Sequence, residues 1–207
     1  MISVVISFRF SADASQDQTR RDVVDKIFNY WQLMSELFGL ELIFINDHSE
    51  NFWVQKSFIY PMPGVKKNWN QPAARNYGAS IARGSHLLFT DIDHILYGNF
   101  NLLESCCLQG HYLLFPRKEK NNDQYTKIKK HRNTFCIKKE DFKQYDEEFC
   151  GNYGHDDSEF FYRLDKTHHE IISKNTLTAF ALGLQSVNLP RDPTINKQLY
   201  NKKTQPH

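Results

Sequence analysis

Short runs of hydrophobic residues alternate along this chain with longer stretches in which apolar residues recur at helical spacing. The runs 2–8, 40–45 and 86–90 are rich in Val, Ile, Leu and Phe, which is typical of strands buried on both faces. Between them, 20–38 and 72–82 place their apolar residues on one helical face. This alternation of strands and helices predicts an α/β domain with a mostly parallel central sheet flanked by helices.

Capping residues set the expected limits of the two helices. Thr19 and Asp22 stand in a capping-box-like relation at the start of the first helix, and Gly39 suits its C-terminal cap. Pro72 suits the first turn of the second helix, which Gly84 is expected to close.

The rest of the chain carries weaker structural signals. We expect these further elements: strands within 52–60, 111–115 and 134–137, and a helix over 157–164. The lysine-rich stretch 116–133 is expected to be a mobile loop. One domain over residues 1–190 would then be followed by a polar tail, residues 191–207.

Composition narrows the class of protein. A chain of 207 residues, 40% of them hydrophobic, suits one compact core, and a net charge of +2 gives no strong attraction to nucleic acid. The 4 cysteines include no CxxC pair, which indicates reduced thiols. No stretch approaches the roughly 20 apolar residues of a membrane span, and the N-terminus lacks the basic region of a signal peptide. The sequence therefore predicts a cytoplasmic protein whose contact with a membrane, at its inner face, would be peripheral.

The most informative local feature is Asp91-Ile92-Asp93, directly after the buried run 86–90. Residues i and i+2 of an extended chain point the same way, so the two carboxylates would converge. Convergent anions repel each other, and a divalent cation commonly stabilises them. In α/β sheets, the carboxyl ends of the strands are also where ligands bind.

Each of the other polar candidates has a simpler structural explanation when taken alone. Asp47, in the turn after the second strand, could form an Asx turn. Asp156 and Asp157 suit the N-cap of the last predicted helix. His94 could be a loop histidine without a role.

Together, these segments occur in an informative order. The chain resembles the family 2 glycosyltransferases of the GT-A fold, and the related galactosyl- and N-acetylgalactosaminyl-transferases. The resemblance covers roughly residues 2–165 and combines several ordered motifs. The segments that carry it are VVISFR (4–9), LIFIND (42–47), PAARNYG (72–78), LFTDID (88–93) and YGHDDSEF (153–160).

The resemblance implies a role for each residue on the donor side. Asp47 would contact the nucleotide base, and Asp91 would face the ribose or sugar. Asp93, with Asp91, would ligate Mn²⁺ or Mg²⁺ on the diphosphate, because these ions prefer hard oxygen ligands. The remaining residues assigned to the nucleotide side are Ser7, Phe8, Arg9 and Arg75.

On the acceptor side, the resemblance implies that Asp157 is the general base. It would take the proton from the acceptor hydroxyl during a single displacement that inverts the anomeric carbon. Gly154, His155 and Asp156 would contact the acceptor or sugar, with Asp156 standing where the family usually has Glu.

The third metal ligand that the resemblance leads us to expect is missing from its usual place. Many relatives carry a third metal ligand, usually His, after the acidic pair, whereas the 186–190 region here has none. His168 and His169 are expected to lie in a solvated turn. A degenerate nucleotide-sugar-binding scaffold is therefore the main alternative to an enzyme.

Two further alternatives fit less well. A nucleotidyltransferase would normally have a Gly-rich loop after the first strand, and residues 7–11 contain no glycine. A nucleic-acid-binding module would explain the basic residues of 117–132, but Glu119 and Asp123 interrupt them.

The expected function is metal-dependent, inverting transfer from a nucleoside-diphosphate sugar, a UDP-sugar being favoured. The acceptor would be a hydroxyl of a glycan or glycolipid, as in surface polysaccharide synthesis. Because the chain is short for the family, a partner or a homodimer could complete acceptor binding.

Overall fold

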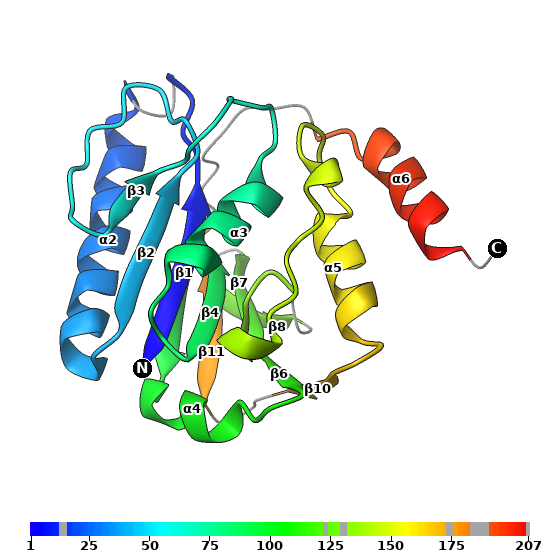
Figure 1. The fold of residues 1–207 in the computed structure, drawn as a ribbon. Helices are drawn as coiled ribbons and strands as arrows, with labels where there is room; N and C mark the ends of the chain where they lie inside the picture. The colour runs from blue at the N-terminus through cyan, green and yellow to red at the C-terminus, as the bar shows by residue number, and fades with distance from the viewer. Residues whose placement is uncertain (13–15, 122–123, 129–131, 173–175, 183–190, 206–207) are drawn as a thin grey trace.

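A computed structural model describes residues 1–207 except 13–15, 122–123, 129–131, 173–175, 183–190 and 206–207 (Figure 1). Among the described residues, seven strands form a central sheet in the order β10-β6-β9-β4-β1-β2-β3. β9 runs antiparallel to β4 and β6, and the other pairings are parallel. The strands are β1 (Ile2–Phe8), β2 (Glu41–Asn46), β3 (Ile59–Pro61), β4 (His86–Asp91), β6 (His111–Leu114), β9 (Phe135–Lys138) and β10 (His169–Ile172).

A second sheet has the order β5-β11-β7-β8. Its strands are β5 (His94–Gly98), β7 (Arg117–Asn121), β8 (Gln124–Ile128) and β11 (Leu177–Ala181). The α-helices are α2 (Gln18–Phe38), α3 (Gln71–Ile81), α4 (Leu103–Cys106), α5 (Asp156–Leu164) and α6 (Thr194–Thr204). Short 3₁₀ turns occupy Phe100–Leu102, Lys139–Asp141 and Glu147–Phe149. The mostly parallel α/β architecture predicted from the sequence is confirmed.

The alternation of side chains along β1 divides the core into two layers. Val4 and Ile6 belong to one apolar cluster with Phe28 of α2, and residues of the second sheet join the same cluster. Val5 faces the other way and packs with α3 and α5. α2 therefore covers one face of the central sheet, and α3 and α5 cover the other (Figure 1).

Gly78 lets α3 approach the sheet closely. A Cβ atom at this position would lie 2.5 Å from Val5 Cγ1 and 3.3 Å from Ile45 Cγ1, both inside normal contact distance. The glycine therefore sets how closely α3 packs on β1 and β2.

The predicted limits of the two long helices need correction at two ends. α2 is capped by Asp17, whose carboxylate accepts a bond from Arg20 N at 3.2 Å, and not by Thr19, which lies inside the helix. Gly39 does end α2, with φ 63°. α3 ends at Ile81, three residues before Gly84.

The prediction of a mobile loop over 116–133 was wrong for 117–121 and 124–128. These residues form the antiparallel pair β7–β8, and β7 also pairs with β11. Because β11 lies about sixty residues further along the chain than β7, no local pattern could reveal this pairing. Likewise, residues 194–204 form α6, where the sequence showed only a polar tail.

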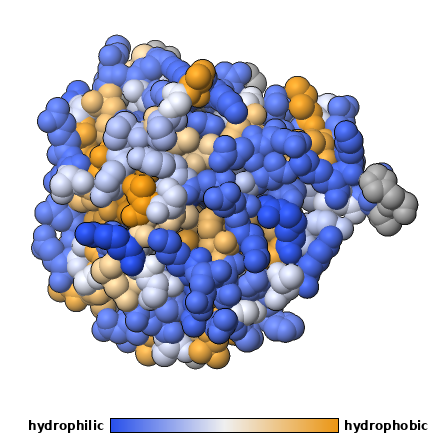
Figure 2. Space-filling view, viewed as in Figure 1, coloured by the Kyte–Doolittle hydropathy of each residue, from blue (hydrophilic) through white to orange (hydrophobic). Residues whose placement is uncertain are grey.

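Among the described residues, no helix has both the length and the apolar character needed to span a bilayer. The face seen in Figure 2 is largely hydrophilic, with hydrophobic residues in separate groups.

Candidate functional site

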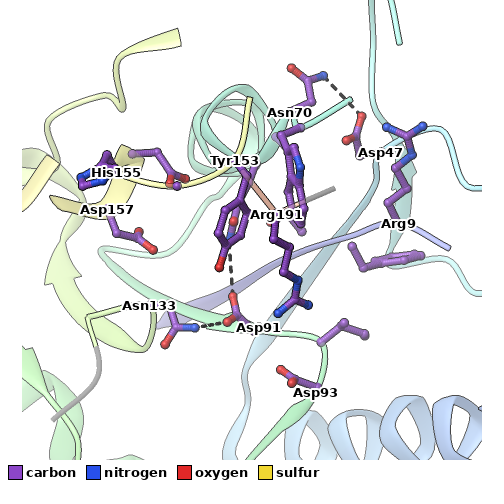
Figure 3. Close-up of a pocket in the computed structure, with 18 of the residues that line it drawn as sticks. Arg9, Asp47, Asn70, Asp91, Asp93, Asn133, Tyr153, His155, Asp157 and Arg191 are labelled. Carbon is purple, nitrogen blue, oxygen red and sulfur yellow. Dashed lines mark hydrogen bonds between the residues drawn. The ribbon is translucent and has the colours of Figure 1, made fainter. Parts of the chain in front are cut away.

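A cavity of about 480 Å³ opens at the carboxyl ends of the central strands (Figure 3). This volume is within the range of small-molecule binding sites. Ten of the residues singled out from the sequence line it: Ser7, Phe8, Arg9, Asp47, Asp91, Asp93, Gly154, His155, Asp156 and Asp157. Residues far apart in the sequence are therefore brought to one place by the fold.

The register of the parallel strands positions the first group. Ser7 pairs with Asp91 of β4 on one side and with Ile45 of β2 on the other. Asp47, one residue past β2, donates its backbone N–H to Phe8 O at 2.8 Å. The carboxyl ends of β1, β2 and β4 consequently present their polar residues at one edge of the sheet.

Asp47 does not form the Asx turn that the sequence allowed. The neighbouring Asn46 holds this turn instead, because its Oδ1 accepts a hydrogen bond from Ser49 N, three residues on, at 2.9 Å. The buried Asp47 carboxylate accepts from Asn70 Nδ2 at 3.3 Å and contacts His48 Nδ1 at 3.0 Å. Asp47 is thus held as a fixed acceptor in the pocket wall (Figure 3).

Arg9 lies in the pocket wall near Asp47 and holds the segment that leads into α3. Its guanidinium donates to the carbonyls of Lys67 and Asn68, at 2.5 and 3.2 Å. The side chain therefore ties the end of β1 to the segment that leads into α3.

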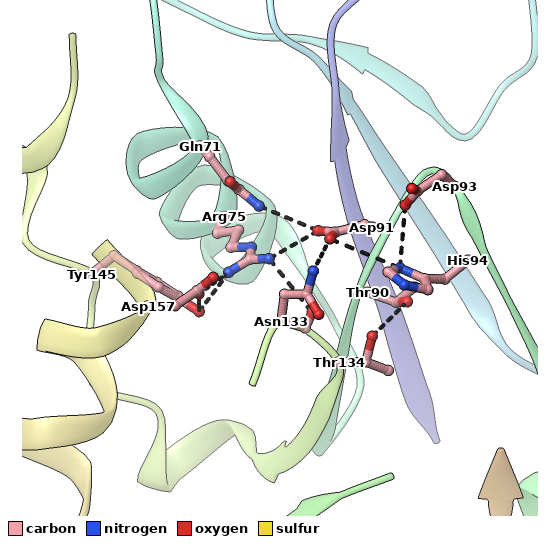
Figure 4. A network of polar contacts seen from close by, with 10 residues as sticks. All are labelled: Gln71, Arg75, Thr90, Asp91, Asp93, His94, Asn133, Thr134, Tyr145 and Asp157. Carbon is pink, nitrogen blue, oxygen red and sulfur yellow. Dashed lines mark hydrogen bonds and ion pairs between the residues drawn. The ribbon is translucent and has the colours of Figure 1, made fainter. Parts of the chain in front are cut away.

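Asp91, Asp93 and His94 form a cluster at the turn between β4 and β5. One potential ligand atom from each lies within 4.8 Å of the others. His94 is 1% exposed, and its Nδ1 atom lies 3.3 Å from Asp93 Oδ1 and 3.8 Å from Asp91 Oδ2 (Figure 4). The two carboxylates converge as the sequence predicted.

The donor set of this cluster fits a divalent cation. Two carboxylates suit Mn²⁺ or Mg²⁺, and an imidazole favours a transition metal such as Mn²⁺ over Mg²⁺. From the sequence, His94 could have been a loop histidine without a role. Its position next to Asp93 was the available signal, but only the turn into β5 points its ring at the carboxylates.

The later histidines do not join this cluster. His168 is buried and lies 3.6 Å from Asp141 Oδ1, so its predicted exposure to solvent was wrong. His169 begins β10, an edge strand of the central sheet that is separated from β1 by β6, β9 and β4. The 186–190 region, where the sequence offered no histidine, lies outside the described residues.

Arg75, which was assigned to the nucleotide side, is a buried neighbour of the pocket. Its side chain is 1% exposed and is not one of the described residues that line the cavity. Its NH1 atom donates to Asp157 Oδ1 at 2.5 Å and to Tyr145 Oη at 2.8 Å, and NH2 donates to Asp91 Oδ1 at 3.2 Å (Figure 4). Arg75 therefore bridges the two carboxylates that stand at opposite sides of the site.

The Arg75 guanidinium stays protonated despite its burial. Burial by itself would lower the pKa of the guanidinium, but Asp157, Tyr145 and Asp91 raise the pKa above its usual value. The bridge is consequently ionic. Asp91 is fixed further by Asn133 Nδ2 and by Gln71 Nε2, the latter at 3.3 Å.

Asp156 and Asp157 begin α5, but neither is its N-cap. The cap is His155, with φ 64° and no side-chain capping bond, so capping does not explain the two acids. Both known partners of the Asp157 side chain, Arg75 and Tyr145, bind Oδ1, and the side chain is 27% exposed toward the pocket. Burial and the neighbouring charge of Asp157 raise the pKa of Asp156 to about 7.

An aromatic pair that sequence analysis did not assign completes the pocket. The rings of Trp69 and Tyr153 lie 4.9 Å apart, and the Arg191 guanidinium lies 5.8 Å from the centre of the Tyr153 ring. All three line the cavity, and Figure 3 labels Tyr153 and Arg191. Arg191 had no sequence signal because it stands in the stretch that was expected to be a tail.

Comparison with known proteins gives matches in structure alone. No known family model and no curated protein matches the sequence. Residues 1–349 of TarS from S. aureus, in complex with UDP, match with a TM-score of 0.57 and 12% identity, over 87% of this chain and 60% of that one. This chain thus spans less than two thirds of the TarS fragment.

Two other solved structures are similar. GalNAc-T7 with UDP, GalNAc and Mn²⁺ matches with a TM-score of 0.61 and 12% identity, over 87% of this chain and 43% of that one. The catalytic domain of Drosophila β1,4-galactosyltransferase 7, in complex with xylobiose, matches with a TM-score of 0.57 and 14% identity, over 100% and 81%. The protein therefore has the GT-A fold of glycosyltransferases, with its acidic cluster at the carboxyl ends of the strands.

Proposed function

We propose that this protein is a metal-dependent, inverting glycosyltransferase that moves a sugar from a nucleoside-diphosphate sugar to a hydroxyl of a glycan or glycolipid. The observation that carries the proposal is the single pocket that unites Asp47, the Asp91–Asp93–His94 cluster and Asp157. UDP is the favoured nucleotide because TarS and GalNAc-T7 were solved with it.

On the donor side, the chain would bind the nucleotide between Arg9 and Asp47. Asp47 is buried and offers an acceptor to a base N–H group, while Arg9 offers positive charge nearby. A divalent cation held by Asp93, with Asp91 and His94, would supply the charge that stabilises the departing diphosphate.

On the acceptor side, Asp157 would act as the general base. Arg75 and Tyr145 hold its Oδ1 atom, and no described residue hydrogen-bonds to Oδ2. Oδ2 could therefore take the proton of an acceptor hydroxyl as that oxygen attacks the anomeric carbon. Trp69 and Tyr153 would offer flat surfaces to a sugar ring, and Asp156 would bind a sugar or acceptor hydroxyl.

The first test is a thermal-shift panel of nucleoside diphosphates and their sugars, each with and without Mn²⁺. A ligand that binds only the folded protein raises the melting temperature. We expect UDP to stabilise the protein in a metal-dependent way, and UDP-sugars to be turned over slowly in the absence of acceptor. Stabilisation by no nucleotide in the panel would contradict the proposal.

One observation favours a second candidate, a nucleotide-sugar-binding protein without transfer activity. Arg75 forms a buried ion pair with Asp157, NH1 lying 2.5 Å from Oδ1, so a structural role also accounts for this carboxylate. Such a protein would bind UDP and Mn²⁺ yet show neither transfer nor hydrolysis.

Location and assembly stay predictions from the sequence. We propose that the protein acts in the cytoplasm, at the inner face of a membrane, and that it could assemble as a homodimer.

A further inference from the structure

We propose that α6, through Asn196, positions the loop 150–155 and thereby the carboxylates at the start of α5. This inference rests on the proposed function, in which Asp157 is the general base. It assigns to residues 194–204 a part in transfer, although they were expected from the sequence to be a polar tail.

Asn196 joins three backbone carbonyls with a single side chain. It is 1% exposed, and its Nδ2 atom donates to Phe149 O at 3.1 Å, Asn152 O at 2.9 Å and Gly154 O at 2.8 Å. Because carbonyl oxygens accept hydrogen bonds only, the NH₂ group and not Oδ1 must face them. Oδ1 has no partner among the described residues, so the hydrogen bonding of this side chain passes through its NH₂ group.

The loop that Asn196 binds has an unusual backbone. Gly151, Gly154 and His155 all have positive φ, at 102°, 85° and 64°. A non-glycine residue in this region is uncommon and is held there by surrounding contacts. The loop therefore needs support from outside, and Asn196 supplies it at Phe149, just before the loop, and at Asn152 and Gly154 within it.

α6 itself is anchored on three sides, which fixes the place of Asn196. Tyr200 stacks on His155 with ring centres 5.4 Å apart, and Tyr162 of α5 donates to Thr204 O at 3.1 Å. Lys203 pairs with Glu148 at 3.1 Å and also with Asp146. The helix is consequently docked on α5 and on the turn that precedes the loop (Figure 1).

This arrangement links Asn196 to the chemistry of the pocket. The loop ends in His155, the N-cap of α5, so its path sets the direction of the first turn that carries Asp156 and Asp157. The backbone of Asp91 is placed by the pairing of β4 with β1, not by this loop. A shift of the loop would therefore change the separation between base and metal site, and a misplacement of about 1 Å can reduce a rate roughly 100-fold.

The test compares Asn196→Ala with Ile195→Ala in the full chain. Ile195 is the matched control because it stands beside Asn196 on α6 and is 58% exposed. We expect Asn196→Ala to lower kcat roughly 100-fold while changing the dissociation constant of UDP with Mn²⁺ less than about 3-fold. Asn196→Ser, which keeps one donor, should lie between Asn196→Ala and the wild type. Ile195→Ala should match the wild type.

Amide hydrogen exchange over 149–157 gives a readout that does not depend on activity. We expect faster exchange there in Asn196→Ala than in Ile195→Ala, with unchanged exchange in β1 and β4. A loss of stability with kcat and loop exchange unchanged would overturn the inference. If the wild type shows no transfer, the proposed function fails, and loop exchange alone then supports or overturns the positioning role. If Asn196→Ala does not fold, the same comparisons made with Asn196→Ser decide.

Discussion

The metal end and the base end of the pocket are built in different ways. At the metal end, Asp91 closes β4, and its position follows from residue-by-residue pairing with β1. At the base end, Asp157 follows a loop with three positive φ angles, which is held by a side chain about forty residues further on. The comparison teaches that a sheet edge places a side chain through local, repeated pairing, whereas a loop needs distant contacts to do so.

Arg75 is the residue that connects the two ends. It lies in α3, which packs on the sheet, and it reaches both Asp91 and Asp157. Changes at the metal end should therefore alter ligand binding, changes at the base end should alter turnover, and changes at Arg75 should alter both.

The largest effect is expected from Asp157→Asn. The amide keeps the size of the side chain but cannot take a proton, so transfer should fall by about 10²–10⁴-fold. Binding of UDP with Mn²⁺ should stay within a few-fold of the wild type, as measured by calorimetry. Turnover close to that of the wild type would exclude Asp157 as the base.

Arg75→Met should weaken both ends at once. Removing one partner of a buried ion pair leaves the other charge without compensation, and we expect a loss of about 3 kcal/mol of folding free energy. Urea unfolding measures the loss, and UDP binding and kcat should both decrease. Arg20→Met is the matched control, because Arg20 pairs with Asp17 and both side chains are more than one third exposed, so the change in stability should be about 1 kcal/mol or less. Equal losses in the two variants would contradict the bridging role.

Asp93→Ala should act on the metal end alone. Loss of a carboxylate ligand should weaken Mn²⁺ binding by about 100-fold, since even outer-shell changes weaken metal sites 10–100-fold. His94→Ala should weaken Mn²⁺ binding less, because two carboxylates remain. Calorimetric titration with Mn²⁺ in the presence of UDP measures both variants. Unchanged Mn²⁺ affinity in Asp93→Ala would remove this cluster as the metal site.

The smallest effect is expected from Asp156→Asn, as a change in the pH dependence of stability. The pKa of Asp156 rises from an ordinary value of 3.8 to about 7 in the folded protein, chiefly because of burial. Between these values the folded state retains a proton that the unfolded state has lost, so stability falls as pH rises through this window. Asp156→Asn, which stays neutral, should melt about 2–4 °C above the wild type at pH 8, with the difference vanishing near pH 4.

The control for this last prediction is Glu36→Gln, which removes one carboxylate from an exposed position on α2. It should show no comparable gain at pH 8. A difference between Asp156→Asn and the wild type that does not depend on pH would show that the charge of Asp156 is not responsible.

The sequence predicted the metal end better than the base end. The apolar run of β4 and the spacing of Asp91 and Asp93 gave the convergence of two carboxylates directly. The residues of the base end, Asp156 and Asp157, were found through the family resemblance. Nothing in the sequence showed which contacts hold them in place. Asn196 and Arg191 lie in a polar stretch without periodic pattern, so nothing local marked them as part of the site.

By itself, the sequence determined the parallel α/β core, its two long helices and the acidic residues at the ends of the strands. These features follow from periodic burial and from short-range capping, which are written in neighbouring residues. Only the tertiary structure decided that Arg75 is a buried bridge, that His94 joins the acidic pair, and that β7, β8 and α6 are ordered elements. Each of these depends on partners distant in the chain, and contacts of that kind leave no periodic trace in a single sequence.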